Sequence, residues 1–221
     1  TVGGNLILGD TILGHAINLI IGSGSVTLQQ SLVQSGGTSI TFTGAGQLNI
    51  GADFQYSQGS FTSGSGTVSY NGTVSQKIAA GVVYDNLVIN NPSGGATTDS
   101  AVTATGGLSI TGGTLVAFAP LSVGGNITVA LGATLDGSTS PISLGGNWTL
   151  NGSFVAGAGE VIFNGGGSQS IGVSSFTNLT ISKPAGTATL AGNLTINGNL
   201  TLSGGTLNLA AFTANDNVGS N

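Results

Sequence analysis

Residues 176–209 read FTNLTISKPAGTATLAGNLTINGNLTLSGGTLNL. Within this stretch, polar and apolar residues alternate in short phrases that begin with asparagine, at 178–181, 193–196 and 199–202. Strict alternation is the pattern of a β-strand with one buried face. Asn197-Gly198 and Gly204-Gly205 separate the phrases and supply the positive φ angles that tight turns need. The stretch therefore predicts short strands joined by tight turns.

The chain also contains a long internal repeat. Residues 58–92 match residues 151–184 at an offset of 93 that becomes 92 after a deletion of one residue, and the match continues from 107–115 to 199–207. The residues conserved between the two copies are phenylalanine or tyrosine, glycine, asparagine and glutamine at fixed places, for example Gln76 and Gln169. We therefore assign long repeats to 55–115 and 148–207, and less regular turns to 1–54.

Two folds suit short strands with tight turns. Asn-Gly pairs favour hairpins, and hence an antiparallel sandwich or barrel. Self-similarity at a fixed period, with one apolar side to each strand, favours a coil of parallel strands that turns from face to face of a prism. We predict an all-β, single-domain parallel β-helix over 1–221. With turns of about 20 residues and about 4.8 Å per turn, it has about eleven coils and a length of roughly 50 Å.

The composition excludes several classes of partner. The 221 residues include 41 Gly, no Cys, two Lys and no Arg, and the net charge is −5. A protein this poor in cations cannot neutralise the phosphates of a nucleic acid. No apolar run approaches the length of a membrane span, so we expect no membrane insertion. The first residue is Thr1, as expected if a signal peptide has been removed or if the chain is a fragment.

Residues 176–209 resemble the Gly/Thr/Asn-rich repeats of large secreted bacterial surface proteins, such as the β-helical passenger regions of adhesins and autotransporters. The resemblance extends over most of the chain from about residue 40 onward. It implies a parallel β-helix outside the cell or at its surface, and it implies no catalytic residues. Because one fold serves many functions, the resemblance specifies architecture rather than activity.

The two ends of the chain share a phrase that suggests how copies meet. Val2-Gly3-Gly4-Asn5 at the start matches 123–126 and resembles 218–221. Uncapped ends of a solenoid expose strand edges that recruit another chain. We expect either head-to-tail stacking of copies or a slice of a longer tandem array, unless the phrase recurs only because glycine is abundant. The interface residues predicted from this phrase and its neighbours are Val2, Gly3, Gly4, Asn5, Leu6, Leu209, Phe212, Val218, Gly219 and Asn221.

The residues needed for catalysis or metal binding are sparse. His15 is the only histidine, and it lies in the apolar segment 11–21, where packing or surface exposure is the usual role. The acidic residues look scattered and mostly adjoin Gly or Asn, which suits turns. Asp136 lacks the preceding glycines of the calcium-binding nonapeptide. We therefore predict no enzymatic activity, no cofactor and no metal.

Lateral binding is the alternative to a structural role. Trp148 and Tyr56 are candidates for a sugar-stacking face, and threonine-rich strands are candidates for an ice-binding face. An ice-binding face needs outward threonines at one fixed position of every turn, and no such column is evident. Asparagines in the chain are expected to bond along the rod.

These observations predict a structural subunit of an extracellular bacterial filament or surface fibre. Its partner is itself, in a head-to-tail polymer. The alternative is an adhesin stalk or a module that binds surface glycans or ice through one lateral face.

Overall fold

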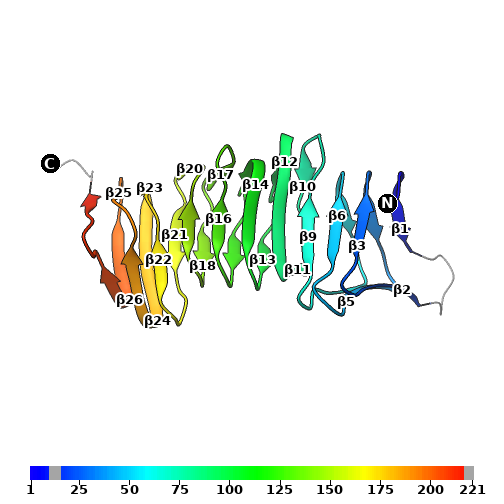
Figure 1. The fold of residues 1–221 in the computed structure, drawn as a ribbon, viewed down its shortest axis with the longest axis horizontal. Helices are drawn as coiled ribbons and strands as arrows, with labels where there is room; N and C mark the ends of the chain where they lie inside the picture. The colour runs from blue at the N-terminus through cyan, green and yellow to red at the C-terminus, as the bar shows by residue number, and fades with distance from the viewer. Residues whose placement is uncertain (10–15, 217–221) are drawn as a thin grey trace.

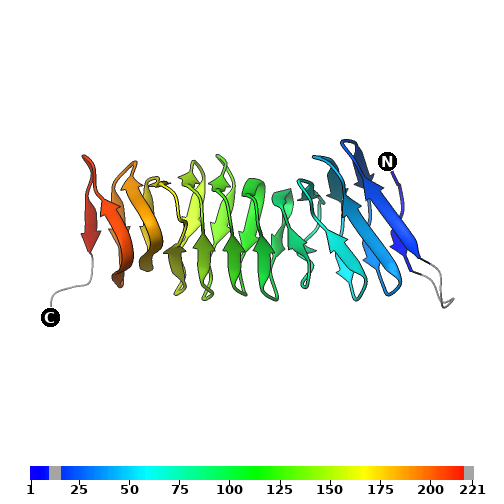
Figure 2. The same ribbon diagram turned by 90° about the horizontal axis from the view of Figure 1, so that it is seen from below.

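Each alternating phrase forms a strand, and successive strands turn around a prism (Figure 1). The structure is a computed structural model that describes residues 1–9 and 16–216. Every strand pairing in this part of the chain is parallel, and it contains no helix. The prediction of a single-domain parallel β-solenoid is confirmed, and the antiparallel sandwich is wrong. Figure 2 shows the strands stacked side by side along one long axis.

The prism has three faces, which the chain visits in a fixed order. Face 1 consists of β3 (Ser25–Leu28), β6 (Gln47–Ile50), β9 (Thr67–Tyr70), the start of β12 (Asn86–Thr97), the start of β14 (Leu108–Val116), β16 (Ile127–Val129), β19 (Trp148–Leu150), β22 (Gln169–Ile171), the end of β24 (Asn178–Leu190) and the end of β26 (Leu200–Asn208).

Faces 2 and 3 follow in the same way. Face 2 consists of β1 (Leu6–Leu8), β4 (Leu32–Gln34), β7 (Phe54–Tyr56), β10 (Gln76–Lys77), the ends of β12 and β14, β17 (Thr134–Asp136), β20 (Ser153–Val155), β23 (Ser174–Phe176), β25 (Leu194–Ile196) and β27 (Ala214–Asp216). Face 3 consists of β2 (Ile17–Ile21), β5 (Thr38–Phe42), β8 (Ser60–Thr62), β11 (Val83–Tyr84), β13 (Val102–Ala104), β15 (Leu121–Val123), β18 (Ile142–Leu144), β21 (Glu160–Phe163) and the starts of β24 and β26.

The solenoid has about ten turns, slightly fewer than the eleven predicted. Turns differ in length: Leu6 lies opposite Leu32, 26 positions further on, whereas Leu108 lies opposite Ile127, only 19 further on. The longest turn, of 26 residues, lies in the segment 1–54, which was expected to be less regular, but a turn of 23 residues also separates Trp148 from Ile171. Within 1–54, β2 and β5 nevertheless pair over their full length. Of the segment 11–21, residues 17–21 form β2, and 11–15 lie outside the described residues.

The alternation places one apolar residue after another on the axis of the rod. On face 1 the inward column runs through residues that lie in register and are almost completely buried: Leu48, Val68, Leu87, Leu108 and Ile127. Full burial of each such side chain contributes about 2 kcal/mol. The core is therefore a continuous apolar column enclosed by three ladders of backbone hydrogen bonds.

Glycine occupies corners where neighbouring turns come too close for a side chain. Gly113 has a φ of +80°, and a Cβ atom there would lie 1.9 Å from the carbonyl oxygen of Asn91 in the turn below. Both the left-handed backbone and this contact require glycine. The high glycine content of the chain therefore follows from the tight stacking of its turns.

The two long repeats do not lie on the same faces. Tyr70 is on face 1, whereas its counterpart Phe163 is on face 3; Phe61 is on face 3, whereas its counterpart Phe154 is on face 2. Phe61 lies on β8 and Phe154 on β20. Because β12 and β14 each run over two faces, the chain passes fourteen faces between these strands, which is four full turns and two further faces. The duplication has therefore preserved packing within the rod but has rotated its outer surface by one face.

We expect Gly113→Ala to lower the free energy of unfolding by more than about 2 kcal/mol, because left-handed backbone strain adds to the clash with Asn91. Chemical denaturation followed by circular dichroism measures this change. Gly167→Ala is the matched control, because a Cβ atom there meets nothing within 4 Å. Its stability should be unchanged or up to about 1 kcal/mol higher. Equal losses in the two variants would contradict the close-approach explanation.

Candidate functional site: the open ends and the charged side chains

The apolar interior is uncovered at the C-terminal end of the rod. Leu200 and Leu202 lie in register with Leu179 and Ile181, which are completely buried. Both leucines lie at the start of β26, on face 3. Because no described strand lies beyond β26 on face 3, they remain 39% and 60% exposed although they point inward. The last described turn thus presents an apolar surface to whatever lies next to it.

The N-terminal end also leaves inward-pointing apolar residues uncovered, but to a smaller extent. Val2 forms a bridge with Leu28, and Leu6 and Leu19 lie in register with residues of the second turn that are completely buried. Leu6 and Leu19 themselves are only half-buried. The described part of this end therefore also leaves the interior column partly open.

Strand edges are unpaired at both ends among the residues that the structure describes. At one end β1 and β2 pair only with β4 and β5; at the other, β26 and β27 pair only with the preceding strands. Unpaired edges are templates for pairing with another chain. Because all strands run in the same sense around the axis, head-to-tail contact would continue the parallel ladders, whereas tail-to-tail contact would oppose the strand directions.

The structure places the predicted interface residues at the two ends. Val2 to Asn5 are exposed at the N-terminal end, and Leu209 and Phe212 are 42% and 38% exposed at the C-terminal end. Val218, Gly219 and Asn221 lie outside the described residues. Sequence reasoning missed Leu200 and Leu202. The available signal was that 199–202 is the last alternating phrase of its face.

Asparagine side chains connect one turn to the next at the corners. The side-chain oxygen of a residue just before or at the start of one strand accepts a hydrogen bond from a backbone N–H in the next turn. Asn126 accepts from the N–H of Asn147 at 2.7 Å, and Asn147 accepts from that of Ser170 at 2.8 Å. The same bond is made by Asn5, Asp53, Asn86, Asn178 and Asn193. Asparagines therefore bond along the rod, at these corners through backbone donors. Asn49 and Asn197 instead donate to side-chain hydroxyl groups of the turn below.

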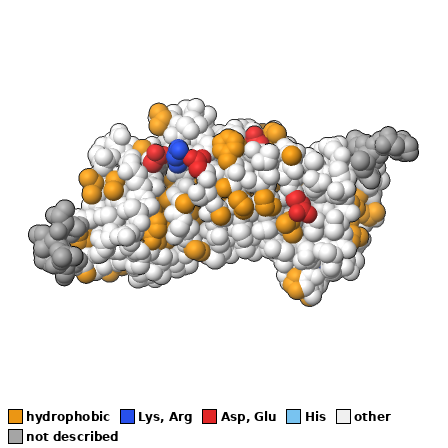
Figure 3. Space-filling view, turned by 180° about the vertical axis from the view of Figure 1, so that it is seen from behind, with side chains coloured by type: hydrophobic (Ala, Val, Ile, Leu, Met, Phe, Trp, Pro, Cys, Tyr) orange, Lys and Arg blue, Asp and Glu red, His pale blue; other side chains and the backbone are white. Residues whose placement is uncertain are grey.

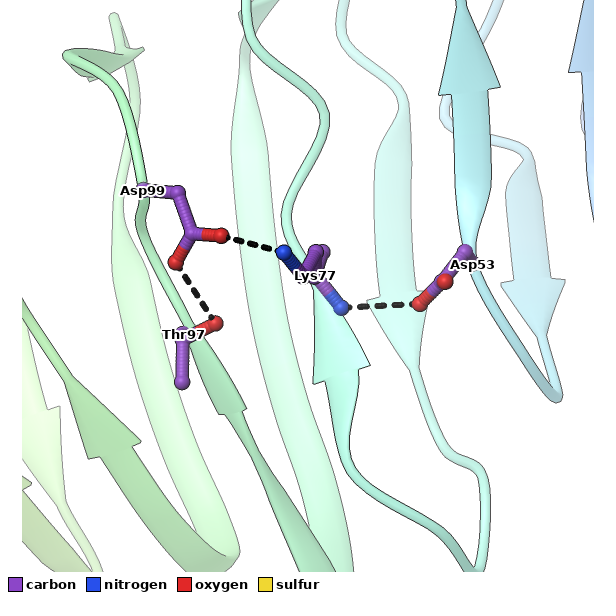
Figure 4. Close-up of polar contacts among 4 residues, drawn as sticks. All are labelled: Asp53, Lys77, Thr97 and Asp99. Atoms are coloured by element: carbon purple, nitrogen blue, oxygen red, sulfur yellow. Dashed lines mark hydrogen bonds and ion pairs between the residues drawn. The ribbon is translucent and has the colours of Figure 1, made fainter.

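Three charged side chains that are distant in sequence lie side by side on successive turns (Figure 4). The Lys77 ammonium lies 2.6 Å from the Asp99 carboxylate, and the Lys77 backbone N–H donates to Asp53 at 2.9 Å. The acids were expected to be scattered, so this grouping corrects that expectation. The signal was their spacing of 24 and 22 positions, close to one turn.

The ion pair is exposed and shifts the pKa of both partners. The hydrogen bond from Lys77, with a second from Thr97, lowers the pKa of Asp99, and the same contact with Asp99 raises the pKa of Lys77. Exposed pairs of this kind contribute little to stability. Figure 3 shows that charged side chains are few on one side of the rod and that most of its surface is uncharged.

Other side chains singled out in the sequence do not form a site. Trp148 is 2% exposed and packs against Phe154 at 4.9 Å between ring centroids, so it cannot belong to a sugar-stacking surface. His15 lies outside the described residues. Among those described, no group of three or more His, Cys, Asp or Glu side chains could hold a metal ion. No helix in the described part of the chain has the length and apolarity to cross a membrane.

Comparisons with known protein families, with curated proteins and with solved structures find no match to this chain. The parallel β-solenoid that the resemblance to bacterial surface repeats implies is present in the structure.

We expect Asn147→Ala to lower the free energy of unfolding by about 0.5–1.5 kcal/mol, because the N–H of Ser170 loses its acceptor in the turn below. Asn151→Ala is the control: this exposed asparagine makes no side-chain hydrogen bond within the described residues. Chemical denaturation compares the two. Similar stabilities for both variants would show that the corner bonds between turns contribute nothing.

Proposed function

We propose that this chain is a structural unit of an extracellular bacterial filament or surface fibre, in which copies join head to tail. The observation that carries the proposal is the open interior column at Leu200 and Leu202, flanked by the unpaired edges of β26 and β27. A second copy that places β1 and β2 over this end would cover the leucines and extend the ladders. Such a contact is heterologous and does not close, so it generates a filament.

Composition and shape support a mechanical role. The described residues form one rod (Figures 1 and 2), whose strands lie across its long axis. Only 4% of the residues are charged, and the outer positions carry mainly Ser, Thr, Asn and Gly. The hydroxyl and amide groups of these residues form hydrogen bonds with water and keep the surface hydrated. They create no charged patch that would attract a ligand of opposite charge. An extracellular location is part of this proposal and rests on the surface composition and on the resemblance to secreted repeats.

A lateral binding face is less well supported. The rotation between the two long repeats places matching outer residues on different faces, so the duplication has not repeated any lateral pattern. The outward column on the middle of face 1 is mixed and is interrupted by valine: Thr27, Asn49, Ser69, Val88, Ser109, Thr128 and Thr149. An ice-binding face would need threonine throughout this column.

We expect the purified chain to form long unbranched filaments in electron micrographs, and Leu202→Lys to abolish them. A lysine at this position places a charge in the contact, where burial without a partner is strongly unfavourable. Leu131→Lys is the matched control, because Leu131 is an 87% exposed leucine in a corner on the side of the rod. This variant should form filaments like the unmodified chain.

Circular dichroism on both variants establishes that the coil is intact. Filaments of equal length and number from Leu202→Lys would contradict the proposed contact. A monodisperse monomer of the unmodified chain at high concentration would contradict the fibre role itself. Binding in a glycan array or inhibition of ice recrystallisation would instead favour the lateral-face alternative.

A further inference from the structure

The ladders are broken at two equivalent places, one in each long repeat. In the first copy, no strand pairing joins β7 to β10 or β8 to β11. In the second copy, none joins β20 to β23, and β19 meets β22 only through Trp148 and Ile171. One face stays fully paired across each break, through β9 and β12 in the first copy and β21 and β24 in the second. Other contacts must therefore hold the turns together there.

Aromatic side chains fill the interior at the breaks. Phe61 and Tyr84 lie on the two strands that fail to pair in the first copy, with ring centroids 6.1 Å apart. Their counterparts Phe154 and Phe176 do the same in the second copy, at 5.8 Å. Tilted rings at these distances attract one another in addition to their burial. Packing thus replaces part of the lost backbone pairing.

A buried glutamine crosses each break and bonds to the turn below. The Gln76 amide donates to the carbonyl oxygens of Ile50 and Ala52, at 2.9 and 2.5 Å. The Gln169 amide donates to those of Leu144 and Gly146, at 3.1 and 2.6 Å. Both glutamines are almost completely buried, and each side-chain oxygen accepts from a backbone N–H four residues earlier.

The turn above supplies a second donor to each glutamine, and here the copies differ. In the first copy the Asn91 amide donates to the Gln76 side-chain oxygen at 3.0 Å. In the second copy the equivalent residue is Lys183, whose Nζ lies 2.5 Å from the Gln169 oxygen and 2.7 Å from the carbonyl oxygen of Gly165. At equivalent places in the two copies, the buried glutamine thus accepts a hydrogen bond from a neutral amide in one and from an ionisable amine in the other.

Among the residues that the structure describes, Lys183 has no opposite charge to pair with. Its side chain is 3% exposed, and both of its acceptors are neutral oxygens. On the strands packed around it (β21, β22 and β26), the only ionisable group is the Glu160 carboxylate, which accepts a hydrogen bond from Thr180. Burial lowers the pKa of Lys183. A buried, unpaired ammonium is costly, because neutral oxygens replace only part of its hydration.

We propose that Lys183 makes the second break a pH-dependent weak point of the rod, which loosens when the amine is protonated, whereas Asn91 holds the first break at any pH. In the unfolded chain the amine has its ordinary, higher affinity for protons. Unfolding therefore takes up a proton at any pH between the folded and the unfolded pKa of Lys183, so stability rises with pH across that interval. The unfolding constant falls by about tenfold per pH unit there.

Chemical denaturation between about pH 6 and about pH 9.5, below the range where tyrosines ionise, tests the proposal. We expect the stability of the unmodified chain to rise towards the upper end of this range. Lys183→Asn, which installs the residue of the first copy, should remove the rise. Asn91→Lys should add a second one. The same pH dependence in all three proteins would overturn the proposal.

Spectroscopy of the amine gives a second readout that does not depend on either variant folding. The chain has only two lysines, so protein labelled with ¹³C at the lysine Cε gives two resolvable signals. The Lys183 signal should titrate at lower pH than the exposed Lys77 signal, whose pKa is raised by Asp99. Two signals that titrate together, or in the reverse order, would overturn the proposal.

Discussion

Parallel backbone pairing between successive turns is the constraint on which the rest of this structure depends. Every strand must present its N–H and C=O groups to the turns on either side, and few water molecules can substitute for them inside the stack. The corners meet the same requirement with side chains. Asn126 and Asn147 accept hydrogen bonds from backbone N–H groups that have no partner in the ladders. Gln76 and Gln169 donate hydrogen bonds to backbone carbonyl oxygens where a ladder is broken.

The composition follows from that constraint. Turns that lie one strand spacing apart leave no room for a Cβ at positions such as Gly113. Like charges stacked in successive turns would repel one another, so a rod of this type tolerates few of them. The single row of alternating sign formed by Asp53, Lys77 and Asp99 is consistent with this limit.

Alternation and the long repeat were enough to predict the fold, because they record which side of each strand is buried. They were not enough to predict which residues meet across turns. Turn lengths between 18 and 26 residues shift the register from one turn to the next, so an average period cannot align Asp53 with Lys77 and Asp99. The same variation concealed the rotation of the two repeats by one face. It also concealed the burial of Lys183.

The stability of the rod and its proposed head-to-tail assembly would both follow from one arrangement: a ladder that is satisfied within the rod and unsatisfied at its described ends. X-ray diffraction from aligned filaments of the purified chain tests this claim most directly. If copies continue one another's ladders, a strong reflection at about 4.8 Å lies along the filament axis. A 4.8 Å reflection perpendicular to that axis would mean that the rods associate sideways, and it would contradict the account.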